Sequence, residues 1–237
     1  MKTKTVAFIS LLALPLAWGD LYLNEIRIDQ PGADNDEYVE IFGTDPSNDS
    51  LADVVLLVIG DGTGGSGVIE NVTEFPDVTL GGDPYYVAAE SSFTLGTADL
   101  TTTLNFENSD NVTFALVRGF TGALYDDLDA DDDGTLDVRP WGELLDGVAL
   151  IESPETPPVN TEWAYTELGP AVGPDGSYAP GHVYRSPDGT GEWKVGEYDL
   201  NADDTPGKSN PQSIPEPSTT ALLALGLLGA AWRKLRR

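Results

Sequence analysis

The sequence of 237 residues contains no cysteine and only one histidine. The absence of cysteine excludes thiol catalysis, zinc-thiolate sites and disulfide bonds. Basic residues are scarce too, with 12 Lys and Arg against 40 Asp and Glu. Nucleic-acid binding depends on basic patches that neutralise phosphates, so this charge balance argues against a nucleic-acid partner. It favours divalent cations, or simple solubility in a salty medium.

Charge is also missing from a stretch at each end of the chain. Lys2 and Lys4 precede an almost wholly apolar run over residues 6–16, and small residues flank Trp18 before Asp20. This order of charge, apolar run and small residues predicts a signal peptide over residues 1–19 and an exported protein. The alternative is a buried strand or helix of the folded domain.

The C-terminal end repeats the pattern in another order. Residues 219–232 carry no charge and are followed by a basic cluster formed by Arg233, Lys234, Arg236 and Arg237. A helix from Ser218 would span only ~22 Å at 1.5 Å per residue. The hydrocarbon core is roughly 30 Å thick, so snorkelling and local thinning would have to close the gap. We expect a short transmembrane helix with its basic end in the cytoplasm and the main domain across the membrane.

Residues 212–237 resemble the PEP-CTERM sorting signal of Gram-negative bacteria. Pro215, Glu216 and Pro217 supply its Pro-Glu-Pro motif, and the apolar run and basic end follow in order. The resemblance implies an exosortase as partner, with an inner-membrane precursor that is cleaved and then released or re-anchored at the cell surface. It also implies bacteria that make exopolysaccharide and biofilm matrix. The alternative is a plain membrane anchor that is never cut.

The middle of the chain predicts a single acidic β-domain over residues 20–211. Without residues 1–19 and 218–237 the chain keeps six of its 12 basic residues and all 40 acidic ones, a charge of 6 − 40 = −34. Glycine and proline are frequent and long helical patterns are absent, which favours an all-β sandwich. The expected strands are residues 21–28, 38–42, 54–59, 85–89, 112–117 and 148–151, with weaker candidates at 68–69 and 78–80.

The order of several short motifs in this middle part resembles a lamin-tail domain. The opening motifs are Asn24-Glu25-Ile26 and Glu37-Tyr38-Val39-Glu40-Ile41. Two closing motifs follow, Arg185-Ser186-Pro187-Asp188-Gly189 and Thr205-Pro206-Gly207-Lys208-Ser209-Asn210. The resemblance implies an immunoglobulin-like β-sandwich. The sequence departs from the family at the glycine-rich residues 60–67 and at insertions over residues 121–145 and 152–181.

A run of aspartates gives the sharpest local signal. From Asp129 it reads D-x-D-x-D-G-x-x-D, which supplies the expected calcium ligands Asp129, Asp131, Asp133, Thr135 and Asp137. Calcium takes six to eight oxygen ligands, and Gly134 stands where an EF-hand loop needs its sharp turn. The twelfth position is Pro140 where an EF-hand has a bidentate Glu, so Glu143, Asp126 or Asp127 would have to complete the shell. The alternative is a solvated acidic hairpin without an ion.

No catalytic constellation stands out. His182 has Asp175, Ser177 and Ser186 nearby in the sequence, but no G-x-S-x-G elbow accompanies them. The tryptophans Trp141, Trp163 and Trp193 offer surfaces for sugar stacking, although core packing is the more ordinary role. We therefore expect a non-catalytic, calcium-stabilised adhesion or matrix-binding module. A secreted hydrolase acting on polysaccharide or phosphoester, and a passive acidic coat protein, are the alternatives.

Overall fold

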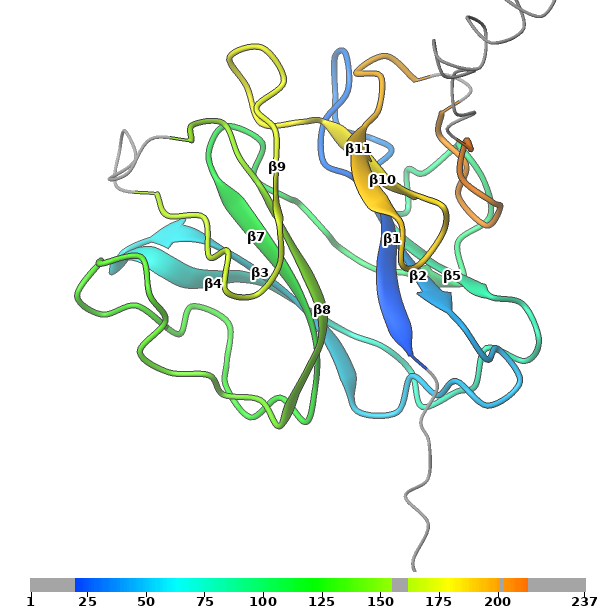
Figure 1. The fold of residues 1–237 in the computed structure, drawn as a ribbon, viewed down its shortest axis with the longest axis horizontal. Helices are drawn as coiled ribbons and strands as arrows, with labels where there is room; N and C mark the ends of the chain where they lie inside the picture. The colour runs from blue at the N-terminus through cyan, green and yellow to red at the C-terminus, as the bar shows by residue number, and fades with distance from the viewer. Residues whose placement is uncertain (1–19, 155–161, 201–202, 213–237) are drawn as a thin grey trace, which may run out of the picture.

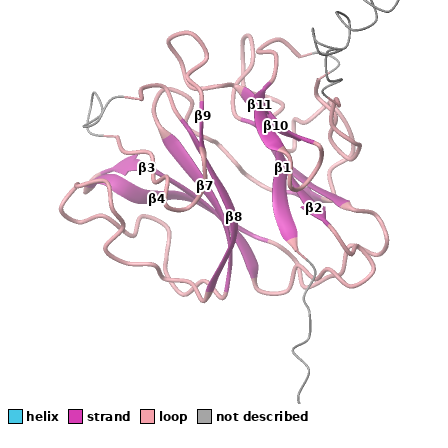
Figure 2. Ribbon diagram, in the orientation of Figure 1, coloured by secondary structure: helices cyan, strands magenta, loops and turns pink. Residues whose placement is uncertain are grey.

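The chain folds into strands and turns. The computed structural model describes residues 20–154, 162–200 and 203–212, and within these ranges no residue is helical (Figure 2). The strands are β1 Leu21–Arg27, β2 Tyr38–Gly43, β3 Val54–Gly62, β4 Gly65–Glu74, β5 Tyr85–Ala89, β6 Leu100–Thr101, β7 Val112–Arg118, β8 Glu143–Leu150, β9 Ala171–Val172, β10 His182–Ser186 and β11 Glu192–Val195. The expectation of an all-β domain is confirmed for this part of the chain.

The strands form two mixed sheets that lie side by side in Figure 1. The six-stranded sheet has the order β11-β10-β1-β2-β5-β6, and the five-stranded sheet has the order β4-β3-β7-β8-β9. Neighbouring strands are antiparallel except for two short pairs, β5 with β6 and β8 with β9. The main hydrophobic core takes residues from both sheets, such as Ile26 and Ile41 from one and Leu56 and Phe114 from the other. The two layers therefore pack as a β-sandwich.

The apolar run over residues 54–59 is buried on both faces, as its sequence predicts. Val54, Leu56 and Val58 face the main core, while Val55 and Leu57 belong to a second hydrophobic cluster. That cluster lies on the other face of the five-stranded sheet. It is completed by residues from the connections on either side of β8, namely Leu128, Leu136, Tyr165 and Leu168. The segment over residues 121–145 therefore covers the sheet with its leucines and is held in place by them.

Several strands differ from the sequence-based expectation. The weak candidate at residues 68–69 is the middle of the ten-residue strand β4, which pairs with β3 around a tight turn from Gly62 to Gly65. The candidate at residues 78–80 was wrong, since only Thr79 makes a single bridge to Ser50. Pro76 and the glycine pair after Leu80 leave too few residues there for a ladder.

Strand β1 carries an irregularity at Asn24. In its pairing with β2, the register shifts between Leu23 and Glu25, so Asn24 has no partner in that ladder. A β-bulge of this kind turns the following side chains relative to the strand. Glu25 is fully buried as a result of its position beside β10, where it pairs with Tyr184. The expected signal peptide and transmembrane helix lie outside the described residues.

Candidate functional site

The predicted calcium loop lies in the connection between β7 and β8. Leu128 and Leu136 bracket most of it, and both side chains are buried against the five-stranded sheet. Two hydrogen bonds tie the loop to β4, since Leu128 N donates to Gly67 O at 2.9 Å and Ser66 N donates to the Asp132 carboxylate oxygen Oδ1 at 2.8 Å. The loop is thus fixed at both ends by burial and along one side by a strand.

The side chain of Asp129 is held in place by several hydrogen bonds. Its side chain is fully buried, and its Oδ1 accepts the backbone N–H of Asp133 at 3.2 Å. Its Oδ2 accepts the N–H of Gly134 at 2.9 Å and lies 2.9 Å from the hydroxyl of Tyr165. Burial and the nearby carboxylate raise the pKa of Tyr165, so that hydroxyl keeps its proton and donates it. These bonds hold one carboxylate in a single orientation.

Three of the five predicted ligands come together. Carboxylate oxygens of Asp129, Asp131 and Asp137 all lie within 4.8 Å of one another. Repulsion from the Asp133 carboxylate, followed by that from Asp137 and Asp129, raises the pKa of the exposed Asp131. An oxygen-preferring divalent cation is the group that relieves such repulsion.

Asp133, a fourth predicted ligand, makes a contact within the turn. The Asp133 carboxylate accepts the backbone N–H of Thr135 at 2.9 Å, so it stabilises the turn. The three residues considered for completing the shell make separate contacts. Asp127 Oδ1 accepts Asp129 N at 3.1 Å, Asp126 Oδ2 accepts Ala123 N at 2.7 Å, and Glu143 pairs with Arg118 at 3.8 Å.

The turn itself depends on Gly134. Its φ of +85° lies in the left-handed region, and a Cβ atom there would stand 2.5 Å from the ring of Trp163. The indole N–H of Trp163 donates to Asp132 O at 2.8 Å. Trp163 therefore packs directly over the aspartate turn, and Trp141 packs against the same hydrophobic cluster. Trp193 packs against the main core.

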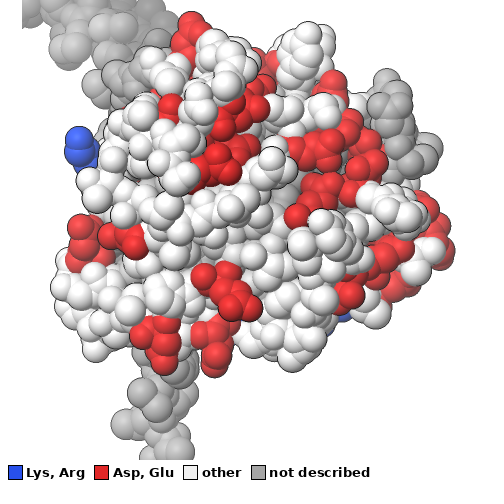
Figure 3. Space-filling model, turned by 180° about the vertical axis from the view of Figure 1, so that it is seen from behind, with Lys and Arg blue, Asp and Glu red and all other residues white. Residues whose placement is uncertain are grey.

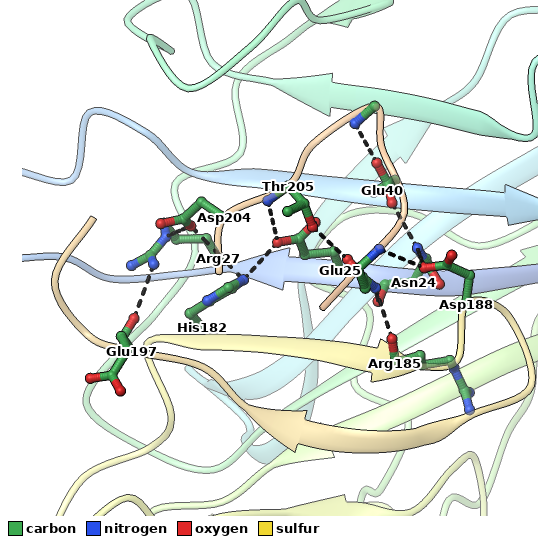
Figure 4. A network of polar contacts seen from close by, with 12 residues as sticks. Asn24, Glu25, Arg27, Glu40, His182, Arg185, Asp188, Glu197, Asp204 and Thr205 are labelled. Atoms are coloured by element: carbon green, nitrogen blue, oxygen red, sulfur yellow. Dashed lines mark hydrogen bonds and ion pairs between the residues drawn. The ribbon is translucent and has the colours of Figure 1, made fainter. Parts of the chain in front are cut away.

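A second polar site, which the sequence reasoning did not find, lies on the six-stranded sheet. Glu25, Arg27 and His182 are all fully buried side by side on β1 and β10 (Figure 4). His182 Nε2 lies 2.8 Å from Glu25 Oε1, and Arg27 Nε donates to Asp204 Oδ1 at 2.6 Å. Both carboxylates accept from protein donors, so this cluster is an internal polar network that includes the Arg27–Asp204 ion pair. Its only sequence signal was the lone histidine.

The partners of this network come from the C-terminal residues 203–212, which we call the strap. Thr205 N donates to Glu25 Oε1 at 3.0 Å, and Gly207 N donates to Glu40 Oε2 at 2.6 Å. Glu40 is fully buried, and burial raises its pKa well above the ordinary value. The strap thus gives backbone donors to two carboxylates that the sheet buries.

Asn210 is the most deeply held residue of the strap. Its side-chain N–H groups donate to Asn24 O at 3.1 Å and to Arg185 O at 2.9 Å, so the amide bridges β1 and β10. Its backbone N–H donates to Asp188 Oδ1 at 3.0 Å. The carbonyl of Asn24 is available at this point because the bulge leaves Asn24 out of the ladder with β2.

A third cluster of acids lies near the β3–β4 hairpin. Carboxylate oxygens of Asp61, Glu70 and Glu107 lie within 4.8 Å of one another. Burial first, and then Glu107, raise the pKa of Glu70 to about 8. Burial and the neighbouring Asp110 raise the pKa of Glu162 to about 9. These carboxyl groups lower their mutual repulsion by holding protons.

Acidic side chains also dominate the surface. Figure 3 shows several separate groups of Asp and Glu over one face of the molecule and very few Lys or Arg. Among the basic residues of the domain, Arg27 and Arg185 are buried in ion pairs with Asp204 and Asp146. Two of the six basic residues in the described part of the chain therefore serve the interior.

Comparison with known protein families identifies one part of the chain. A family model described as the PEP-CTERM protein-sorting motif matches residues 213–237. This match includes the motif residues Pro215, Glu216 and Pro217 and the basic cluster, all outside the described residues. No curated protein and no solved structure matches the chain. In the part of the chain that the structure describes, no helix is long and apolar enough to cross a membrane. The matched motif identifies an exported protein that an exosortase system sorts from a membrane-anchored precursor to the cell surface.

Proposed function

We propose that this protein is a non-catalytic, calcium-stabilised adhesion or matrix-binding module, displayed or released at the cell surface through its sorting motif. The observation that carries the proposal is the aspartate loop, in which carboxylate oxygens of Asp129, Asp131 and Asp137 lie within 4.8 Å of one another. The sorting motif supports a surface location. Exopolysaccharide or another matrix polymer is the partner class that fits this location.

The geometry of the loop supports calcium over a bare acidic turn. Asp129 is oriented by three donors before any ion binds, which lowers the cost of assembling a site. The exposed positions of Asp131 and Asp137 leave room for waters, which commonly complete a calcium shell. In calcium's presence these carboxylates would hold together the loop that covers the five-stranded sheet.

The position of the only histidine supports a non-catalytic role. His182 is fully buried and its Nε2 is engaged by Glu25. Ser186, which stands near it in the sequence, donates its hydroxyl to Pro211 O at 2.9 Å. A nucleophile and base of the Ser-His type need a hydrogen bond between them and access to substrate, and these contacts offer neither.

The lamin-tail resemblance is part of the same proposal. Its opening residues Asn24, Glu25 and Glu40 and its closing residues Thr205 and Asn210 meet in one buried network. These contacts give the motif residues from opposite ends of the domain one shared structural role. An immunoglobulin-like description of the sandwich is proposed on this basis.

Calorimetric titration of the full-length chain in detergent with calcium tests the proposal, together with thermal melts with and without chelator. We expect a dissociation constant of about 10⁻⁴–10⁻³ M, typical of extracellular modules. A hundredfold excess of calcium over that constant then stabilises the fold by about 2.7 kcal/mol. Asp131→Ala and Asp137→Ala should abolish binding, whereas Asp77→Ala, at an exposed position elsewhere, should not.

A second measurement tests the surface role. Retention of the protein in extracted matrix should fall when calcium is chelated, and the Asp131→Ala variant should be released with or without chelator. Titration without heat and melts without a shift would reject the calcium part. Retention that ignores chelator would reject the calcium-dependent adhesion part while leaving export and sorting untouched.

A further inference from the structure

The strap is held by polar contacts and has few apolar ones. Pro206 and Asn210 are its buried residues, while Gly207, Lys208 and Ser209 between them are exposed. Nine hydrogen bonds join it to residues of the sheet or of the turn after β10, such as Glu25, Glu40 and Asp188. A segment fastened mainly by exchangeable hydrogen bonds opens at a lower free energy than the hydrophobic core beneath it.

The strap runs directly into the sorting motif. The matched motif begins at residue 213, one residue after the strap ends, and only Ser213 and Ile214 separate Gln212 from Pro215. The covalent chain therefore allows at most about 11 Å between Gln212 and Pro215. A domain of this length has a radius of gyration of about 16 Å. With the strap docked, a bulky folded body stays next to the segment that the sorting enzyme must hold.

We infer that the strap is a latch that limits access to the sorting motif, and that it opens before the exosortase system processes the chain. Release of residues 203–212 adds up to about 35 Å of extended chain between the body and the motif. This added reach is enough for an enzyme site to enclose the motif. The inference rests on the sorting motif and is independent of calcium.

Asn210 sets the strength of the latch. Its amide satisfies two buried carbonyls on different strands, and its own oxygen accepts from the Thr205 hydroxyl at 2.8 Å. Loss of buried hydrogen bonds of this kind shifts a local equilibrium by about tenfold or more. The substitution Asn210→Ala should therefore raise the population of the open latch without removing any residue of the hydrophobic core.

Trypsin gives a direct readout of the open state. Lys208 lies in the middle of the strap, and cleavage after it requires several residues of extended, undocked chain. At low protease, the cleavage rate follows the population of the open form. In the full-length chain, Asn210→Ala should raise the rate at the 208–209 bond about tenfold. Asn48→Ala, at an exposed site far from the strap, should leave that rate unchanged.

The same variants are then followed in a host that carries the exosortase system. Mass spectrometry of the precursor and the processed form should show faster processing for Asn210→Ala than for the parent chain. A flexible Gly-Ser spacer of about ten residues, inserted after Gln212, should also speed processing while cleavage after Lys208 stays slow. The spacer keeps the test decisive even if the alanine variant folds poorly.

Three results would overturn the inference. Equal acceleration of cleavage after Lys208 and after Arg118 in β7 would mean that the whole domain opens and that no separate latch exists. An unchanged rate at Lys208 in Asn210→Ala would mean that this residue does not hold the strap. Faster cleavage at Lys208 with unchanged processing, in the alanine and spacer variants alike, would mean that access to the motif is not limited by the strap.

Discussion

Nε2 of His182 lies 2.8 Å from Oε1 of Glu25, and both side chains are fully buried between β1 and β10. The same carboxylate accepts the backbone N–H of Thr205, so it joins the sheet to the strap. A buried carboxylate with several donors is costly to remove, because its partners then lose their acceptor in a region without water.

The first prediction concerns this carboxylate. Glu25→Ala should destabilise the domain by about 3 kcal/mol, because His182 and Thr205 lose a buried hydrogen-bond acceptor. Glu192→Ala removes an exposed carboxylate that pairs with Lys194 at 3.0 Å, and it should change stability by about 0.5 kcal/mol at most. Urea unfolding of both variants measures the difference. Equal stabilities would contradict the view that Glu25 is a structural centre.

The second prediction concerns the support of the aspartate loop. Tyr165→Phe removes the hydroxyl that lies 2.9 Å from Asp129 Oδ2 and leaves that buried oxygen with one donor fewer. A loss of about 1–3 kcal/mol is expected in chelator. Tyr178→Phe is the matched control, because the Tyr178 side chain is 71% exposed. A Tyr165→Phe variant as stable as the parent chain would show that the hydroxyl does not hold Asp129.

The third prediction concerns Gly134. Substitution by Ala should destabilise the domain by about 2–4 kcal/mol, since it combines a left-handed backbone with a clash against the ring of Trp163. Gly176→Ala supplies the comparison, because Gly176 has φ of +65° with nothing within 4 Å of the added Cβ, and it should cost only about 1 kcal/mol. Thermal unfolding of the two glycine variants separates the cost of the clash from the cost of the left-handed backbone conformation. Similar losses in both variants would argue against close packing of Trp163.

The fourth prediction concerns pH. The pKa of Glu70 is about 8 in the folded domain, against an ordinary value of 4.5, so the folded state binds this proton more tightly than the unfolded chain. Its contribution to stability is therefore full below about pH 4.5 and is lost as the pH rises to about 8. With allowance for solvent screening of a half-buried group, Tm in chelator should fall by roughly 5 °C between pH 5 and 8.

The control for the pH dependence is a pair of Glu→Gln variants. Glu70→Gln should reduce the fall in Tm between pH 5 and 8, because the glutamine side chain does not titrate, while the raised pKa of Glu37 and of Glu162 keeps part of the dependence. Glu192→Gln, at an exposed position in β11, should keep the full dependence. A parent profile that is level from pH 5 to 8, or one that Glu70→Gln leaves unchanged, would contradict a strongly perturbed Glu70.

The strands that the sequence predicted well have simple apolar patterns. The run over residues 54–59 and the segments at 85–89 and 112–117 bury most of their side chains, so hydrophobicity alone located them. Strands β10 and β11 were missed because His182, Arg185 and Lys194 interrupt any apolar alternation. Those polar residues can lie in strands because the strap and neighbouring carboxylates supply hydrogen-bond partners for them. Only the folded chain brings these partners together.

For the candidate calcium ligands, too, the sequence pattern was sufficient only in part. The spacing of the aspartates was sufficient to place Asp129, Asp131 and Asp137 near one another. Spacing did not distinguish a carboxylate that points to a common centre from one that caps its own turn, as Asp133 does. The contacts of the buried network around Glu25 could not be predicted from the sequence, because its members stand up to 186 residues apart.

The bridge made by Asn210 also decides how the domain responds to mechanical load. A surface protein held through its C-terminal end receives pulling force at Gln212, and the first buried side chain on that path is Asn210. Its amide passes the force to β1 and β10, each of which has a neighbouring strand on both sides. Because the strap opens at a lower free energy than the core beneath it, its hydrogen bonds break first while the paired strands stay folded. The exit route therefore lets the chain lengthen under load before the sandwich itself is strained.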